Sequence, residues 1–443
     1  MKKLKMAVLI VLVLVMSASL LYGCAPKTEP SASASPSASA TPSASPSASS
    51  PATTSPEIPA IGDPNSEVYT MSNRIPWSGL YGPQEKSRAS IDKAIKADNK
   101  KDKVKVGYVT WTNGTPFFAA MTEEITKECQ KNGFELTTAV SDGDLNKQVA
   151  NIQNMVTLGV DVIIDCDLDV NTETPAIKDA VAAGVPVIGL GLPFQADSPA
   201  ITTAATTYYE QGFLVGKYAA DQYKDKEVIA ATSPGQIGHT IAESKLNGFI
   251  GGFVYERAIQ MGKPFPSRED AMLYGYNLEQ QIVKTAKFSD PDYNWSVVAS
   301  LDGAWSQEGG MKAAQDIVTA HPDINLFFTD NDQEGFGAIK ALQQAGLKVG
   351  TDVLVASVGD GTKEAVQMVK DGTYLCLTLA SPYTWAKTTT DLVYKIFHDG
   401  FDATNMPSEI FMQNVLVTKD NADQWLSDSE FSTLPDVTFT TLG

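Results

Sequence analysis

The sequence predicts an α/β protein made of two doubly wound parallel-sheet lobes, and three observations lead to this fold class. From residue 104 onward, short apolar segments alternate with amphipathic segments of helical period, the pattern of a parallel sheet covered on both faces. The pattern breaks near Thr206 and then starts again. Residues 104–443 provide about 340 residues, enough for two domains of about 150 residues each.

The first unit opens with a buried strand and a helix that begins at Pro116, a position that tolerates the missing N–H. This helix stops at Asn132 and Gly133, residue types that are common at helix ends. The expected strands cover 104–110, 134–140, 160–165 and 185–190, and the expected helices cover 116–131, 145–156 and 176–183.

The second unit starts after residue 206, where Thr207 and Glu210 have the spacing of a capping box. Residues 259–294 interrupt this unit as an insertion of unclear structure. Two such units leave a cleft between them. The expected strands cover 227–231, 295–300, 324–329, 353–357 and 374–379, and the expected helices cover 242–258, 307–320, 333–345, 363–371 and 383–398.

The N-terminal residues predict secretion and a lipid anchor. Three lysines among the first five residues precede an apolar run at 6–16, and residues 21–24 read Leu-Tyr-Gly-Cys, which is similar to a lipobox. The apolar run is shorter than a membrane-spanning helix, which needs about 20 residues. We therefore expect a signal peptide at 1–23 and lipid on Cys24 that holds the protein at the extracellular face of the cell membrane. The alternative is an uncleaved anchor.

Two further segments precede the first lobe. Residues 24–59 are mostly Ser, Ala, Pro and Thr, a composition that cannot bury a core and that predicts a disordered tether. At roughly 3 Å per residue, this tether can hold a domain up to about 100 Å from the membrane. Residues 60–103 form an N-terminal extension with a helix-capable stretch at 85–98, and either lie against the first lobe or form a semi-ordered lead-in.

Charge and cysteine content argue against several functions. The formal net charge is −18, and loss of the three signal lysines changes it to −21 (−18 − 3). The sequence has no basic run, so no nucleic-acid partner is expected, because phosphates need cationic contacts. Cys129, Cys166 and Cys376 have no paired spacing and histidines are few, so we expect no metal site and no cofactor. A disulfide between two of these cysteines stays open.

Candidate ligand-binding residues stand at the ends of the expected strands, because ligands of parallel sheets bind beyond the carboxyl ends of the strands. These residues combine aromatic rings with amides and carboxylates. That mixture suits a sugar, whose hydroxyl groups pair with Asp and Asn and whose C–H faces pack on flat rings. For His239, a plain surface position is the alternative. The candidates are Trp111, Thr115, Phe117, Phe118, Gly191, His239, Trp305, Asp330, Asn331, Asp332 and Asp360.

Some candidates also have a structural interpretation. Because adjacent helix residues face different ways, we expect one of Phe117 and Phe118 in the pocket and the other against the sheet. Asp330 and Asp332 can equally cap the helix that starts near residue 333. A core position for Trp305 is likewise open.

Four short motifs, taken in order, resemble a known family. Residues 115–118 read Thr-Pro-Phe-Phe where the family has Asn-Pro-Phe-Phe, and residues 183–187 read Ala-Gly-Val-Pro-Val. Ala-His-Pro-Asp-Ile at 320–324 precedes Asp-Asn-Asp at 330–332, and Gly-Asp-Gly-Thr follows at 359–362. On these motifs the chain from Val104 to about Thr418 resembles the periplasmic sugar-binding proteins of the ribose/galactose type, the type I solute-binding proteins of ABC importers.

The resemblance implies the architecture. The family has two similar lobes that are joined by a three-strand hinge and close on a sugar. Applied to this chain, it implies crossings near residues 206, 380 and 411. The implied N-terminal lobe is 104–206 plus 381–410, and the implied C-terminal lobe is 207–380 plus 411–435.

The resemblance also implies roles for individual residues. Phe117 and Phe118 match aromatic residues that sandwich the sugar ring. Trp305 falls where the second lobe supplies an aromatic side chain, and Asn331 and Asp360 match residues that bind hydroxyl groups.

Departures from the ribose type, together with Trp111, imply a pocket reshaped for a ligand other than ribose. Thr115 replaces Asn, Gly191-Leu192 replaces an Asp-Arg pair, Ala380 replaces Gln, and Glu243 or Lys245 replaces Arg.

The leading hypothesis is a lipoprotein that captures a small polar ligand, expected to be a sugar, and presents it to an ABC transporter permease. The alternative is a sensory lipoprotein that signals to a receptor or kinase, and the partner would distinguish the two. We do not expect an enzyme, since the sequence shows no nucleophile elbow, phosphate loop or metal cluster.

Overall fold

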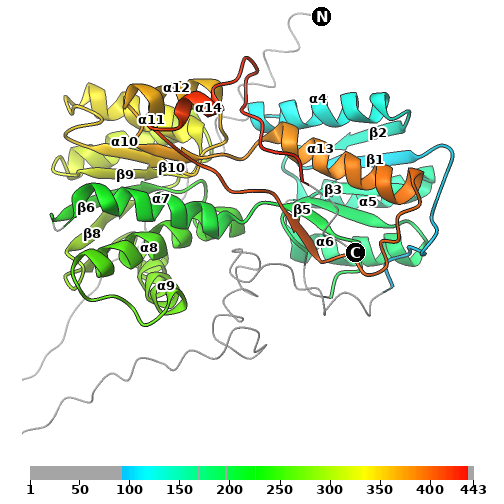
Figure 1. Ribbon diagram of the computed structural model, residues 1–443, viewed down its shortest axis with the longest axis horizontal. Coiled ribbons are helices and arrows are strands. Elements are labelled where there is room, and N and C mark those ends of the chain that lie inside the picture. Colours follow the sequence, from blue (N-terminus) through cyan, green and yellow to red (C-terminus); the bar gives the residue numbers. More distant parts are fainter. Residues whose placement is uncertain (1–91, 168, 195–196, 225, 438–443) are drawn as a thin grey trace, which may run out of the picture. The chain divides into compact units, whose positions relative to one another are not determined.

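The computed structural model describes residues 92–167, 169–194, 197–224 and 226–437 (Figure 1). The predicted signal peptide, Cys24, the tether and the N-terminal extension up to residue 91 lie outside the described residues. Among the helices of the described ranges, none combines the length and apolarity needed to cross a membrane.

The first sheet forms the N lobe, with parallel pairing throughout in the order β12-β5-β4-β3-β1-β2. Strands β3 and β4 are buried along their whole length, as expected for a sheet with helices on both faces. The order reverses between β3 and β1, which places a crevice at the carboxyl ends of these strands. The elements are β1 Lys105–Thr110, α4 Pro116–Lys131, β2 Glu135–Val140, α5 Leu145–Leu158, β3 Val162–Cys166, α6 Val170–Ala182, β4 Val187–Gly191, β5 Thr203–Ala205, α13 Pro382–Val393 and β12 Glu409–Phe411.

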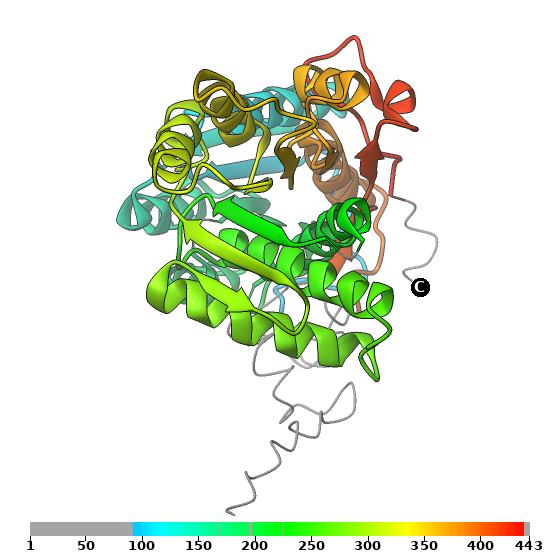
Figure 2. The ribbon, with the colours of Figure 1, turned by 90° about the vertical axis from the view of Figure 1, so that its left-hand side faces the viewer.

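The second sheet forms the C lobe in the order β13-β11-β10-β9-β6-β8-β7. Its edge strands β13 and β7 pair antiparallel and the strands between them pair parallel. Figure 2, with the C lobe toward the viewer, shows helices on both faces of this sheet. The elements are α7 Tyr208–Tyr223, β6 Val228–Ser233, α8 Thr240–Gln260, α9 Arg268–Thr285, β7 Phe288–Asp290, β8 Trp295–Ser300, α10 Gln307–Ala320, β9 Leu326–Thr329, α11 Asp332–Gln344, β10 Leu354–Ser357, α12 Lys363–Asp371, β11 Cys376–Thr378, β13 Leu416–Thr418 and α14 Ala422–Trp425.

These two sheets confirm the predicted α/β class. The chain passes from the N-lobe sheet to α7 after β5, from the C-lobe sheet to α13 after β11, and from β12 to β13.

The insertion at 259–294 contains the end of α8, helix α9 and edge strand β7. Helix α9 is held to α7 by Arg268, its first residue. Arg268 forms an ion pair with Glu210 of α7, and its guanidinium lies 4.1 Å from the ring centroid of Phe213, also of α7. The predicted capping box is therefore wrong: Glu210 binds Arg268, and Thr207 makes no side-chain cap to α7.

Helices α7 and α8 pack closely through glycines. A Cβ built on Gly216 would lie 2.0 Å from Phe249 O, and one on Gly248 would lie 2.0 Å from Tyr209 O. Only a residue without a side chain allows this approach, so the glycines set the spacing of the two helices.

The C-terminal strap, residues 430–434, bonds to both lobes. On the C lobe, Lys363 N donates to the carbonyl of residue 430 (2.8 Å), and Ser432 N donates to that of residue 361 (2.8 Å). On the N lobe, Leu434 N donates to Thr384 Oγ1 (3.0 Å). Phe431 is buried between these two attachments, with 1% of its surface exposed.

The described part of the N-terminal extension lies along the N lobe. Lys101 N donates to Phe397 O (2.7 Å), and its ammonium pairs with Asp161 (2.9 Å). Residues 92–98 are not helical, so the expected helix is absent from this part of the stretch.

The three cysteines of the described residues, Cys129, Cys166 and Cys376, are free and buried. Near the end of α13, helix geometry changes to a π-helical turn at Tyr394–His398.

Candidate ligand-binding site

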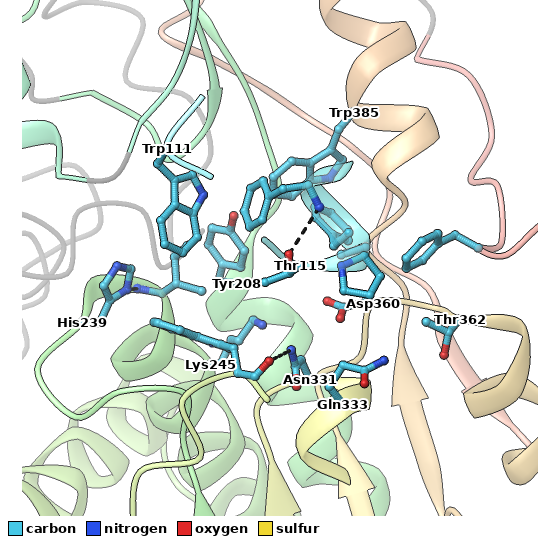
Figure 3. Close-up of a pocket in the computed structure, with 17 residues that line it drawn as sticks. Trp111, Thr115, Tyr208, His239, Lys245, Asn331, Gln333, Asp360, Thr362 and Trp385 are labelled. Atoms are coloured by element: carbon cyan, nitrogen blue, oxygen red, sulfur yellow. Dashed lines mark hydrogen bonds between the residues drawn. The ribbon is translucent and has the colours of Figure 1, made fainter. Parts of the chain in front are cut away.

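A cavity of about 100 Å³ lies between the two lobes, beyond the carboxyl ends of strands from both sheets (Figure 3). It is far larger than the roughly 10–15 Å³ that one water molecule needs. Most of the predicted site residues meet in its wall, namely Trp111, Thr115, Phe117, Phe118, His239, Lys245, Trp305, Asn331 and Asp360.

The N-lobe wall is aromatic. Thr115 caps α4, its Oγ1 accepting from Phe118 N (3.5 Å), and Pro116 occupies the first turn. The ring of Phe118 lies edge-on to Trp111 (4.9 Å between centroids) and to Phe117 (5.4 Å). Both phenylalanines line the cavity, and Phe117 is also a buried member of the N-lobe core, whereas Phe118 is only partly buried.

Trp305 enters the cavity from the C lobe on a tight left-handed turn. Its φ is +47° and that of Ala304 is +53°, a region that costs non-glycine residues energy. Glu334 holds this turn, because its Oε1 accepts from Trp305 N (2.7 Å). The indole Nε1 donates to Asp330 Oδ2 (2.6 Å), and the ring packs edge-on against His239 at 4.9 Å.

Asp330 lies behind this wall, fully buried, and does not line the cavity. Its Oδ2 also accepts from Gly235 N (3.1 Å). The Lys245 ammonium donates to Asp330 O (2.8 Å) and lies 3.6 Å from Oδ1. The carboxylate therefore orients Trp305 and offsets the charge of Lys245, and it does not cap α11.

Asp332 has a second supporting role. Its Oδ1 accepts from Asp360 N (3.1 Å), and its Oδ2 accepts from Thr362 N and Thr362 Oγ1 (both 2.7 Å). These bonds hold the loop that presents Asp360. The cap of α11 is Asn331, whose Oδ1 accepts from Glu334 N (3.0 Å), so the capping interpretation of Asp330 and Asp332 is wrong.

The Asp360 carboxylate lines the cavity, and within the described part of the chain no hydrogen bond to it is formed. Burial and then the nearby Asp332 raise the pKa of Asp360 to about 8, while the Lys245 ammonium opposes the shift. An oxygen pair without a protein partner at a cavity wall is available to ligand hydroxyl groups.

His239 caps α8, since its Nδ1 accepts from Ile241 N (3.3 Å). Burial lowers the pKa of His239, which favours the neutral ring. With Nδ1 as acceptor, the proton sits on Nε2 and makes the ring a neutral donor.

Gly191 lines a smaller recess of about 40 Å³ beside the cavity. Its φ of +111° is a backbone conformation that glycine adopts readily and other residues rarely adopt. A Cβ at this position would lie 3.3 Å from Trp385 Cζ3. The carbonyl of Gly191 accepts from Tyr208 Oη (3.5 Å).

The sequence did not predict several cavity residues. Tyr208 follows β5 and Trp385 follows β11, where the chain passes between the sheets. Their place next to the predicted crossings could have indicated that they line the cleft. Trp385 Nε1 donates to Thr206 Oγ1 (3.0 Å), which turns its ring toward Phe117. Phe431 carries no local signal, because it comes from the strap. The other unpredicted lining residues include Ile241, Gln333 and Thr362.

Comparison with known proteins gives this geometry a family. A model described as a periplasmic binding protein domain matches residues 106–399. The ribose import binding protein of Bacillus subtilis (strain 168) is 24% identical over 306 residues, covering 69% of this chain and 85% of that protein. The galactofuranose-binding protein of Escherichia coli (strain K12) is 22% identical over 272 residues, covering 60% of this chain and 74% of that protein.

A solved structure is similar as well. An ABC transporter solute binding protein from Mycobacterium smegmatis, with bound glycerol, has a TM-score of 0.58 at 25% identity and covers 75% of this chain and 99% of that chain. Since the family model spans well over half of the chain and the two-sheet fold agrees with it, this chain belongs to the periplasmic binding protein domain family.

Proposed function

We propose that this protein is the extracellular solute-binding component of an ABC importer and captures a small sugar in the cavity between its lobes. The observation that carries the proposal is the two-sided wall. Aromatic rings come from the N lobe, and the C lobe adds Trp305, Asn331 and the carboxyl group of Asp360, to which no described residue forms a side-chain hydrogen bond. Rings pack on the C–H faces of a sugar while polar groups bind its hydroxyls.

The relatives support the same class of ligand, because the ribose import and galactofuranose-binding proteins are both named for sugars. The ligand proposed here is a sugar other than ribose. Thr115 and Gly191, which stand where the resemblance expects other residues in the ribose type, lie at the cavity and its recess. Lys245, one of the two residues matched to the family's Arg, also lines the cavity.

Capture requires the lobes to separate and close. The chain connections between the sheets are short, at 206–207, 379–381 and 412–415, which suits a hinge motion. A permease would recognise the closed form. Lipid on Cys24 would keep the protein at the outer face of the membrane, next to that permease.

The experiment is a titration of the purified protein with sugars and polyols, read by tryptophan fluorescence and thermal shift. Trp111, Trp305 and Trp385 line the cavity, so a bound sugar should change the emission. Ligand at a hundred times its Kd should stabilise by about 2.7 kcal/mol.

For a sugar that changes the fluorescence and melting temperature of wild type, Asp360→Ala should abolish both changes. The matched control is Asp316→Ala, an exposed carboxylate on α10 that pairs with Lys312. Absence of a response to every sugar, or an unchanged affinity in Asp360→Ala, would overturn the proposal.

A further inference from the structure

The recess beside the cavity continues the ligand site toward β3. The two spaces share Trp111, Tyr208 and Trp385 in their walls. The recess exists because residue 191 is glycine, with no side chain to fill the space against Trp385. A ligand in the cavity can therefore extend a substituent into it.

Asp167, directly after β3, lines this recess with 6% of its surface exposed. Its Oδ1 accepts from Leu192 N (3.2 Å). Its Oδ2 is buried and has no hydrogen-bond partner among the described residues. A buried carboxylate oxygen without a partner costs free energy, so its retention calls for an explanation.

Two other buried carboxyl groups, Glu173 and Asp165, lie near Asp167, and neither forms a hydrogen bond to its Oδ2. Glu173 Oε1 accepts from Asp169 N (3.0 Å), and Asp165 Oδ1 accepts from Gln148 Nε2 (2.9 Å). Asp167 and Tyr208 both line the recess, and after burial the charge of Asp167 is the largest cause that raises the pKa of Tyr208.

No residue of the described ranges supplies a cation to this oxygen. Of the described residues lining the cavity and the recess, Lys245 alone carries a permanent positive charge, and it is bound to Asp330. The His239 ring is favoured in its neutral form, because burial lowers its pKa. The described residues therefore leave Asp167 Oδ2 without a hydrogen-bond donor.

We infer that the recess is a subsite in which Asp167 Oδ2 accepts a hydrogen bond from a hydroxyl or ammonium group projecting from the ligand. This inference rests on the proposed function. It assigns Asp167 as a specificity-determining residue and the ligand as a sugar with a donor-bearing arm.

The test compares wild type with Asp167→Asn and Asp167→Leu, using paired probes. D-Ribose and D-allose differ, in the pyranose form, by one hydroxymethyl group. D-Galactose and D-galactosamine differ by hydroxyl against ammonium. Melting temperature is measured without ligand, and affinity is measured by calorimetry for each probe that binds. Asp316→Asn is the control on the protein surface.

Burial and then the nearby Glu173 raise the pKa of Asp167, which penalises its charged form. Without ligand, Asp167→Asn should therefore melt no lower than wild type, because the amide is neutral and keeps an acceptor for Leu192 N. With a probe that reaches the recess, affinity should fall about tenfold or more in Asp167→Leu. Retention of affinity in Asp167→Asn identifies a hydroxyl arm, and loss in both variants identifies an ammonium arm.

Two results would overturn the subsite. One is a bound probe whose affinity neither variant changes. The other is a ligand-free Asp167→Asn protein that melts more than about 4 °C below wild type, which would show a structural role. If no probe binds wild type, the sugar proposal fails, and the ligand-free melting temperatures still decide whether Asp167 is held for binding.

Discussion

The indole of Trp305 and the carboxylate of Asp330 are joined by a 2.6 Å hydrogen bond from Nε1 to Oδ2. A cavity-lining ring is thus oriented by a group that does not itself reach the cavity. The same carboxylate lies 3.6 Å from the Lys245 ammonium, so two cavity residues depend on it.

Asp330→Ala should destabilise the fold. It leaves the buried Lys245 ammonium without its carboxylate and the Trp305 Nε1–H without an acceptor. Breaking such a buried pair costs about 3–5 kcal/mol. Chemical denaturation measures the loss, with Asp316→Ala as the exposed control. Equal unfolding free energies in the two variants would contradict the role of Asp330.

The raised pKa of Asp360 predicts a dependence of stability on pH. In the unfolded chain this carboxyl titrates near 3.8, and in the folded protein near 8. Between these values the folded state holds a proton that the unfolded state has released. The free energy of unfolding should therefore fall as pH rises through this window.

Asp360→Asn should remove that contribution. The difference in unfolding free energy between variant and wild type, measured by denaturation at several pH values, should grow from pH 4 to pH 8 in favour of the variant. A constant difference would mean that Asp360 has an ordinary pKa.

Gly216→Ala should force α7 and α8 apart, because its Cβ would fall 2.0 Å from Phe249 O. Overpacking of this kind costs about 1–3 kcal/mol, and more where backbone has to move. Thermal unfolding should show the loss, whereas Gln222→Ala on the exposed side of α7 should leave the melting temperature nearly unchanged. A Gly216→Ala protein as stable as wild type would show that the two helices can separate at little cost.

Phe431→Ala should weaken both the fold and ligand binding. The ring packs against Phe117 (6.0 Å between centroids) and Tyr383 (6.0 Å) of the N lobe, and its loss should cost about 3–5 kcal/mol. Leu158→Ala, at a position 60% exposed, is the control. Normal ligand affinity in a folded Phe431→Ala protein would remove Phe431 from the site.

The sequence predicted the layers of this fold well, because strand and helix periods are local properties. It also predicted the carboxyl-end residues that form the cavity wall, since parallel strands bring those ends together. It could not assign Asp330, Asn331 and Asp332 to separate roles, because consecutive residues after one strand point in different directions.

Long-range contacts were beyond the sequence pattern. The local spacing predicts that Glu210 caps a helix, yet Glu210 pairs with Arg268, which lies 58 residues further along the chain in the insertion. Asp167 lies at the end of an apolar strand. Its position in the recess depends on Gly191 and Leu192, which are distant in the sequence, so the local pattern does not predict it as a site residue. Phe431 enters the cavity wall from a segment with no periodic pattern.

The C-terminal strap links the lobes through hydrogen bonds rather than through a chain crossing. If the strap does not move with both lobes, a rotation that opens the cleft would break its bonds to Gly361 and Lys363 or its bond to Thr384. Docking of the strap and binding of ligand in the cavity would then be thermodynamically coupled. Ligand would raise the equilibrium constant for strap docking by the same factor by which docking raises the affinity for ligand. The rate at which a protease cleaves the strap would therefore fall when ligand fills the cavity, although the cleaved segment lies outside the three chain crossings.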